Sequence, residues 1–187
     1  MALMGTDRRL FLAAALDDDT RHALATFVSA PGMPEIPGRR VPPPNWHITL
    51  RFLGRSTSVQ QELVLATLDE ELDVSAFEIG FGGIGAFPYP AKATVVWLAV
   101  EDGGQDLEEL AVSCERAAVR AGYDPEERPF HPHLSLSRVR PHQDLQDLVE
   151  QYPPFPARLR IDSVVLYESI TSSSGARYTE LDRVGLR

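Results

Sequence analysis

The sequence predicts an α+β protein with two similar lobes, each presenting one strand to a shared cleft. Two observations lead to this fold class. A short string of residues that begins at His47 is echoed at His133, and each copy alternates apolar and polar residues as a half-buried strand does. The predicted elements around each copy also follow a similar order of strand, helix, motif strand and helix. We therefore expect residues 1–187 to form a single bilobal domain.

The two motif strands have an apolar back and a polar front. His47 and Thr49 share one face of the first strand, and His133 and Ser135 share one face of the second. Each front thus carries an imidazole followed two residues later by a hydroxyl. By the same alternation, Arg51 shares the face of His47.

The first half of the chain reads as strand, helix, strand, helix. A short apolar run at 9–16 predicts a buried strand, and three aspartates at 17–19 suit the N-terminus of a helix that ends at Pro31. Residues 32–44 form a proline-rich loop with a short extended piece near Arg39. After the first motif strand a helix begins at Ser58, with Gln61 completing a capping box. Its predicted inner side is formed by Val59, Leu63, Ala66, Leu68 and Leu72.

The second half repeats this order. Strands are predicted at 77–81 and 94–100, the first followed by glycines that indicate bends or bulges, and Trp97 is assigned to the core. A helix at 105–121 has a continuous apolar stripe that contains Cys114, which we expect to be an unreactive core thiol. The second motif strand, a short helix at 143–150 and a final pair of strands at 159–167 and 177–184 complete the chain, with a turn at 172–175.

Composition limits the classes of function. The formal net charge of −9 argues against binding nucleic acid by bulk phosphate attraction, although a cleft can be locally positive. One cysteine excludes an internal disulfide framework. No apolar run is long enough to span a bilayer, and the first 16 residues do not resemble a signal peptide. We expect a monomeric cytoplasmic protein with no membrane partner.

Two histidines on polar strand faces suit proton transfer at phosphorus. An imidazole titrates near 6.5, so one ring can act as base while the other acts as acid. The two hydroxyls and an arginine would hold the phosphate oxygens. The chain has neither of the glycine-rich loops typical of nucleotide binding, and no cofactor is expected. The alternative is that both histidines are edge or core residues bonded to backbone.

At this point the sequence resembles a family. The paired motifs are those of the two-histidine phosphoesterases, and their context is similar to the bacterial and archaeal RNA 2′,3′-cyclic phosphodiesterases, also called 2′-5′ RNA ligases. The matching stretches, in order, are residues 9–13, 47–54, 85–88, 95–98, 128–138 and 166–169, with Gly175 and Tyr178. The resemblance implies two antiparallel sheets facing a cleft, helices outside and no metal. It implies hydrolysis of an RNA-terminal or nucleoside 2′,3′-cyclic phosphate to a 2′-phosphomonoester, with 2′-5′ ligation as the reverse chemistry.

The resemblance also implies roles for individual residues. His47 corresponds to the proton donor and His133 to the general base, while Thr49 and Ser135 correspond to phosphate-binding hydroxyls. Ser135 stands where threonine is more usual in the family. Arg138 matches an arginine that contacts phosphate or nucleotide, but simple alternation places it on the face opposite His133, so its use requires a strand end where it can turn.

Several interpretations stay open. The chain could be a non-catalytic module that binds RNA ends, or a two-histidine esterase for another small cyclic nucleotide. Arg51 could contact phosphate or pair with a carboxylate, and Phe52 and Phe130 could stack on a base or pack in the core. His131 is expected at the cleft rim, since a metal site needs three or four converging ligands.

Overall fold

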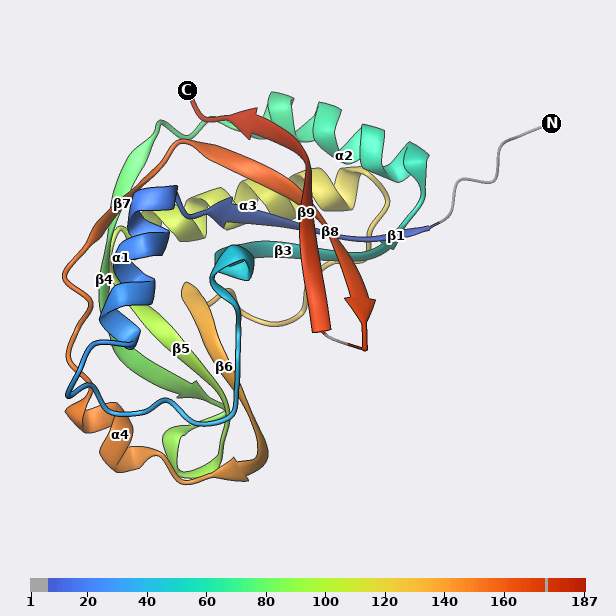
Figure 1. Cartoon of the computed structure of the whole chain (residues 1–187). Coiled ribbons are helices and arrows are strands. Elements are labelled where there is room, and N and C mark those ends of the chain that lie inside the picture. Colours follow the sequence, from blue (N-terminus) through green and yellow to red (C-terminus); the bar gives the residue numbers. More distant parts are fainter. Residues whose placement is uncertain (1–6, 174) are drawn as a thin grey trace.

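The computed structural model describes residues 7–173 and 175–187. Its element order follows the order expected from the sequence, except that one predicted strand, at 159–167, is divided into two (Figure 1). The strands are β1 (Arg8–Ala15), β2 (Arg39–Arg40), β3 (His47–Ser56), β4 (Phe77–Phe87), β5 (Ala93–Asp102), β6 (His133–Gln143), β7 (Arg158–Ile161), β8 (Ser163–Ser172) and β9 (Gly175–Gly185). The helices are α1 (Asp18–Val28), α2 (Ser58–Glu71), α3 (Gly104–Arg120) and α4 (Gln146–Gln151), with 3-10 turns η1 (Pro43–Asn45) and η2 (Pro90–Lys92).

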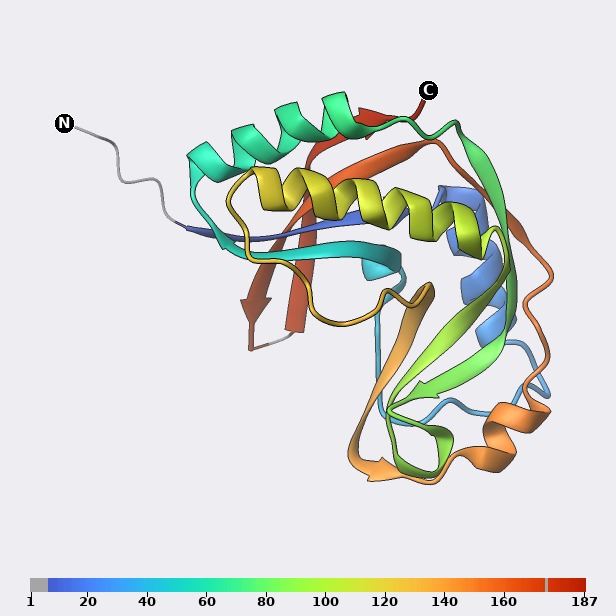
Figure 2. The same ribbon diagram turned by 180° about the vertical axis from the view of Figure 1, so that it is seen from behind.

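The strands form one curled antiparallel sheet, in the order β7-β4-β5-β6-β3-β1-β8-β9, with β2 paired to the edge of β6. The α+β class and the antiparallel pairing are therefore confirmed. The halves β7-β4-β5-β6 and β3-β1-β8-β9 meet where β3 lies against β6, and one residue pair, Ile48 with Leu134, joins these two strands. Beyond this pair the motif strands diverge, and the sheet opens into two walls (Figures 1 and 2).

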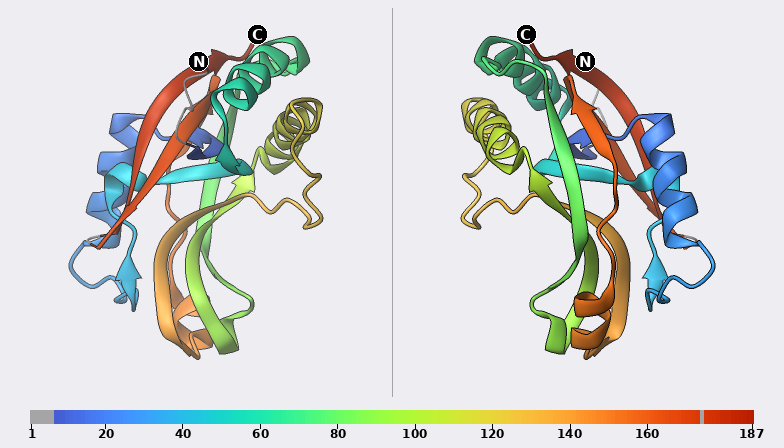
Figure 3. Two further views of the ribbon diagram at one scale, coloured as in Figure 1. Left: turned by 90° about the vertical axis from the view of Figure 1, so that its right-hand side faces the viewer. Right: turned by 90° about the vertical axis from the view of Figure 1, so that its left-hand side faces the viewer.

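The order of strands is symmetrical about that junction. An approximate two-fold relation exchanges β3 with β6, β1 with β5, β8 with β4, and β9 with β7. Helices cover the outside of each half. α2 and α3 lie side by side over the half that contains β3, and Phe27 of α1 packs on Tyr152 and Phe155 over the other half (Figures 2 and 3). None of the helices in the described part of the chain is long and apolar enough to cross a membrane.

The expected inner side of α2 is wrong in part. Leu68 and Leu72 are buried as predicted, but Val59 and Leu63 are exposed, and Val64 is buried in their place. The helix begins at Ser58 as expected, but its N-cap is Thr57, and the capping box uses Gln60 instead of Gln61. Apolar residues occur on every side of this helix, and its hydrophobic periodicity therefore selects no face.

The strand predicted at 159–167 is two strands. The chain changes sheet partner at Asp162, so that β7 pairs with β4 in one half and β8 pairs with β1 in the other. Ser174, in the predicted turn between β8 and β9, lies outside the described residues. β4 also continues through its glycines to Phe87, and its pairing with β5 has register shifts after Gly80 and after Phe81, as expected for bulges at the glycines.

Candidate active site

The pairing of β3 with β6 brings the four motif side chains to one face. Ile48 and Leu134 lie directly opposite each other and are fully buried, so both point to the core side of the sheet. Their neighbours point to the other side. His47, Thr49, His133 and Ser135 therefore share the inner face of the curled sheet, and each is partly exposed. The two histidines and two hydroxyls come together as the sequence predicts.

A β-bulge explains how Arg138 joins this group. Trp97 and Val96 of β5 pair with Ser135 and Ser137 of β6, so Leu136 is an extra residue. An extra residue reverses the alternation that follows it. Ser137 is thus fully buried, and Arg138 is exposed on the face of His133. The expectation that Arg138 lies on the face opposite His133 is therefore wrong, and Arg138 does not need a strand end in order to reach the face of His133.

β3 has a bulge at the matching position. Leu12 and Ala13 of β1 pair with Arg51 and Thr49, which leaves Leu50 as the extra residue. Five residues after its histidine, Phe52 therefore lies on the same inner face of the sheet as His47 and is 56% exposed. Phe52 and Arg138 occupy equivalent places in the two halves, each five residues beyond a motif histidine.

The same bulge turns Arg51 away from His47. Its side chain is 92% buried on the core side, where its guanidinium forms an ion pair with Glu115 of α3. It also donates hydrogen bonds to the backbone carbonyls of Phe52 and Asp124. Of the two roles considered for Arg51, the structure places it with a carboxylate, where it ties β3 to the segment that leads into β6.

His47 is held in one orientation and one tautomer. Its Nδ1 lies 2.7 Å from the carbonyl oxygen of Asn45, which can only accept, so Nδ1 carries the proton. Nε2 is then the acceptor in the 2.9 Å hydrogen bond from the Thr49 hydroxyl. Asn45 is itself fixed, because its side chain donates to the carbonyl of Ala176 in β9. The imidazole packs between Phe11 and Tyr178, with ring centroids 4.8 and 5.2 Å away.

His133 repeats this arrangement on the other strand. Its Nδ1 donates to the carbonyl of His131 at 2.7 Å, which leaves Nε2 as the unprotonated nitrogen of the neutral ring. Phe87 and Trp97 flank it, at centroid distances of 5.0 and 6.1 Å. The assignment of Trp97 to the core is wrong, because its indole faces inward beside both His131 and His133.

Burial keeps both imidazoles neutral at pH 7. Desolvation lowers the pKa of His47 from 6.5 to about 4, the hydrogen bond to Asn45 opposes this, and the charge of His133 lowers it further. Burial also lowers the pKa of His133, again opposed by its backbone hydrogen bond and assisted by the charge of His131.

The aromatic side chains around the histidines were not expected from the sequence. Phe11 and Phe87 lie in apolar runs and have the pattern of core residues, and no local signal separates a core aromatic from one that walls a site. Only the pairing of β1 with β3 and of β4 with β5 places them beside the imidazoles. His131 is exposed, as expected for a rim residue. In the described part of the chain, no three His, Cys, Asp or Glu side chains are grouped as metal ligands would be.

A curled antiparallel sheet with two inward-facing histidines at its two-fold junction defines a class of phosphoesterases. Residues 35–172 match the model of the 2′-5′ RNA ligase superfamily, and the chain belongs to this family. It is 34% identical to the RNA 2′,3′-cyclic phosphodiesterase of Aeropyrum pernix, over 80% of this chain and 86% of that protein. It is 33% identical to the RNA 2′,3′-cyclic phosphodiesterase of Archaeoglobus fulgidus, over 92% of this chain and 97% of that protein. The crystal structure of Escherichia coli LigT complexed with 3′-AMP superposes with a TM-score of 0.79 at 28% identity, covering 96% of this chain and 98% of that one.

Proposed function

We propose that the chain is a phosphodiesterase that opens RNA-terminal or nucleoside 2′,3′-cyclic phosphates to 2′-phosphomonoesters, with no metal or cofactor. One observation carries the proposal. Two imidazoles on adjacent antiparallel strands are each held at Nδ1 by a backbone carbonyl two residues earlier, which leaves both Nε2 atoms for proton transfer on the same face. The activity named for the Aeropyrum pernix and Archaeoglobus fulgidus relatives supports it.

His133 acts as the general base. Its Nε2 takes a proton from water as the water oxygen attacks phosphorus, and the bond from phosphorus to the ribose 3′-oxygen breaks on the opposite side. His47 acts as the general acid and gives its Nε2 proton to that departing oxygen. The phosphate keeps the 2′-linkage, and the two imidazoles exchange their protonation states. When a 5′-hydroxyl attacks phosphorus in place of water, the same bond to the 3′-oxygen breaks, and the same proton transfers give a 2′-5′ phosphodiester with a free 3′-hydroxyl.

The low pKa of His47 requires that the substrate help to protonate it. In the free protein His47 is neutral at pH 7, but a general acid must carry a proton. A bound cyclic phosphate places a negative charge beside the ring, and a nearby opposite charge raises the pKa of an imidazole. The bound substrate thus favours the protonated form of His47, which acts as the general acid when the cyclic phosphate is opened. The Thr49 hydroxyl, which donates to His47 in the free protein, turns to donate to a phosphate oxygen once Nε2 is protonated.

The cleft side of the two bulges supplies the remaining contacts. Arg138 and the Ser135 hydroxyl donate to the phosphate oxygens, which are the acceptors a guanidinium binds best. Phe52, at the equivalent place in the other half, provides an exposed ring on which the terminal base stacks. The site is complete within one chain, so we infer a monomer, and we place it in the cytoplasm, where its single buried thiol stays reduced.

The proposal is tested with His47→Ala and His133→Ala, and with His22→Ala as a matched control on the exposed face of α1. Each protein is incubated with a 2′,3′-cyclic mononucleotide in a chelator, and the product is identified by chromatography. Wild type and the control should form the 2′-phosphate, while each site variant should lose a factor of about 10²–10⁴ in kcat. Near-normal turnover in both site variants contradicts the two-histidine mechanism. A 3′-phosphate product reverses the leaving-group assignment.

The same assay separates the alternatives. Binding of a cyclic-phosphate RNA end without conversion would identify a non-catalytic module. Turnover of ADP-ribose cyclic phosphate, with none of 2′,3′-cyclic nucleotides, would identify an esterase for a different small cyclic nucleotide. Loss of activity in chelator that one metal restores would contradict the metal-independent reaction.

A further inference from the structure

Charge is distributed unevenly between the cleft and the rest of the protein. Residues 36–61, 79–100 and 128–143 contain β2, both motif strands, and most of β4 and β5. Together they hold eight of the 18 Lys and Arg residues and none of the 27 Asp and Glu residues. The negative net charge therefore comes from the remaining segments. The three segments are positive in sequence, although two of their arginines, Arg51 and Arg128, are paired with Glu115 and Glu126. Such separation focuses a favourable potential for an anion in the cleft of an acidic protein.

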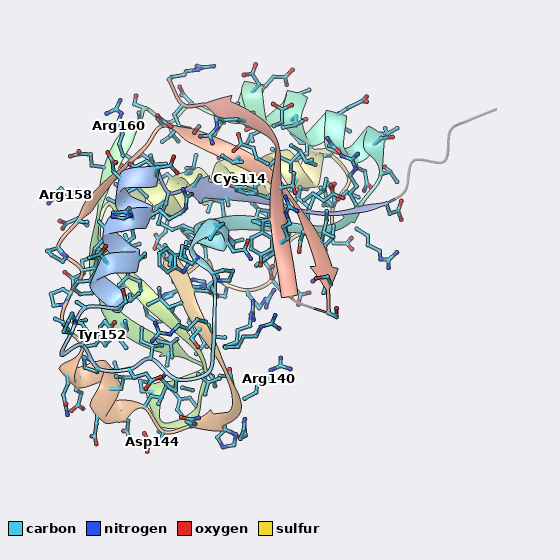
Figure 4. The ribbon with its side chains drawn as sticks, viewed as in Figure 1. Cys114, Arg140, Asp144, Tyr152, Arg158 and Arg160 are labelled. Carbon is cyan, nitrogen blue, oxygen red and sulfur yellow. The ribbon has the colours of Figure 1, made fainter. Side chains whose placement is uncertain are left out.

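Arg140 continues this positive surface beyond the proposed phosphate site. Val139 is fully buried, so Arg138 and Arg140 on either side of it point to the same inner face of β6. Figure 4 shows Arg140 reaching from β6 toward the open side of the molecule, away from α4. Neither Arg138 nor Arg140 forms an ion pair with a carboxylate in the described part of the chain, in contrast to Arg116, Arg120 and Arg183.

A third arginine lies on the neighbouring strand. β2 pairs with β6 so that Arg39 is directly opposite Arg138, and opposite residues of an antiparallel pair share a face. The Arg39 guanidinium lies against Gly175 at the start of β9. Arg39, Arg138 and Arg140 thus form a stripe along β2 and β6, which we call the arginine stripe.

The stripe extends too far for a mononucleotide. Two residues of a strand span about 7 Å, so Arg140 lies about 7 Å beyond Arg138 along β6, away from His133. A 2′,3′-cyclic phosphate ends an RNA chain at its 3′ side, and any further phosphate belongs to the nucleotide before it. We propose that Arg140 binds the phosphodiester that precedes the terminal nucleotide, so that the preferred substrate is a single-stranded RNA end and not a free cyclic mononucleotide. This inference rests on the proposed function.

The test compares Arg140→Gln with Arg160→Gln, a matched loss of one charge at the opposite edge of the molecule (Figure 4). For each protein kcat/KM is measured on a 2′,3′-cyclic mononucleotide and on a tetranucleotide with the same 3′ end. Wild type and Arg160→Gln should prefer the tetranucleotide. Arg140→Gln should lose about tenfold of that preference, the typical loss for one charge-assisted contact, and Arg140→Lys should keep most of it.

A binding measurement keeps the outcome independent of turnover. Fluorescence anisotropy with a tetranucleotide that ends in a 2′-phosphate gives the dissociation constant at several salt concentrations. Arg140→Gln should lower the slope of log affinity against log salt by about 0.7, the value for one phosphate contact on a single strand. Equal slopes and equal preferences in Arg140→Gln and Arg160→Gln would overturn the stripe while leaving the proposed function intact. Wild type that binds the RNA with the expected slope but converts neither substrate would contradict the proposed function alone.

Discussion

Lowering the pH from 7 to 5 should destabilise the native protein by about 2 kcal/mol through His47. Its pKa is about 4 in the native state, chiefly because burial disfavours the charged ring, and 6.5 in the unfolded chain. Below pH 6.5 the imidazole is therefore protonated in the unfolded state and still neutral in the native state, so the free energy of unfolding decreases as the pH falls. The stabilisation is present above pH 6.5 and is lost progressively toward pH 4. One pKa unit is worth about 1.4 kcal/mol, so the full difference is about 3 kcal/mol, of which about 2 kcal/mol is lost by pH 5.

The assay is urea unfolding at pH 7 and pH 5 for wild type and His47→Gln. Most carboxylates are still ionised at pH 5, and groups common to both proteins cancel when the two pH-dependent changes are subtracted. Wild type should lose about 2 kcal/mol more than the variant between these pH values. An equal change in the two proteins would refute the conclusion that the fold holds His47 neutral.

A bound anion extends this prediction to the proposed mechanism. If a phosphate between the histidines raises the pKa of His47, then a saturating 2′-nucleotide should reduce the extra loss of wild type at pH 5. If a nucleotide concentration shown to saturate the site gives no reduction, the conclusion that a bound phosphate raises the pKa of His47 is contradicted.

Two further substitutions test how the site is supported. Arg51→Met should lower the free energy of unfolding in urea by about 3 kcal/mol, because it removes the cation paired with Glu115 and the donor to the Asp124 carbonyl. Adding Glu115→Leu to this variant should recover part of the loss. A loss below about 0.5 kcal/mol would show that the ion pair of Arg51 with Glu115 does not stabilise the fold. Gly85→Ala should cost about 1–3 kcal/mol and lower kcat/KM, since a Cβ at Gly85 would overlap the Trp97 indole beside His133. Gly104→Ala is its control, because a Cβ there meets no other atom.

The fold followed from the sequence where a local pattern had one physical solution. The 105–121 helix has a continuous apolar stripe and was placed within a residue of its observed ends, and Cys114 lies fully buried in it as expected (Figure 4). α2 has apolar residues on all sides, so its buried face depends on what α3 offers it and not on its own periodicity. No glycine or proline precedes or follows Asp162 to indicate a break in the strand. The break arises because the residues before Asp162 pair with β4 and the residues after it pair with β1, in the other half of the sheet.

The candidate site also has a part that the sequence predicts correctly and a part that it predicts wrongly. The spacing of histidine and hydroxyl depends on two-residue alternation over three positions, and the four motif side chains share a face as the alternation requires. Beyond those positions alternation gave the wrong face for Arg51 and Arg138. Each motif strand has an extra residue three positions after its histidine. Nothing in the sequence distinguishes these residues, Leu50 and Leu136, from leucines of a regular strand that point to the core.

The paired bulges also explain why two similar halves can form an asymmetric site. In each half the residue four positions after the histidine turns to the core, and the residue five positions after it turns to the cleft. The core positions hold Arg51 and Ser137, and the cleft positions hold Phe52 and Arg138. A cleft with two identical walls could not distinguish the two ends of a nucleotide. An aromatic ring in one half and a guanidinium in the other would give the base and the phosphate different places, and this is the asymmetry that the proposed donor role of His47 and acceptor role of His133 require.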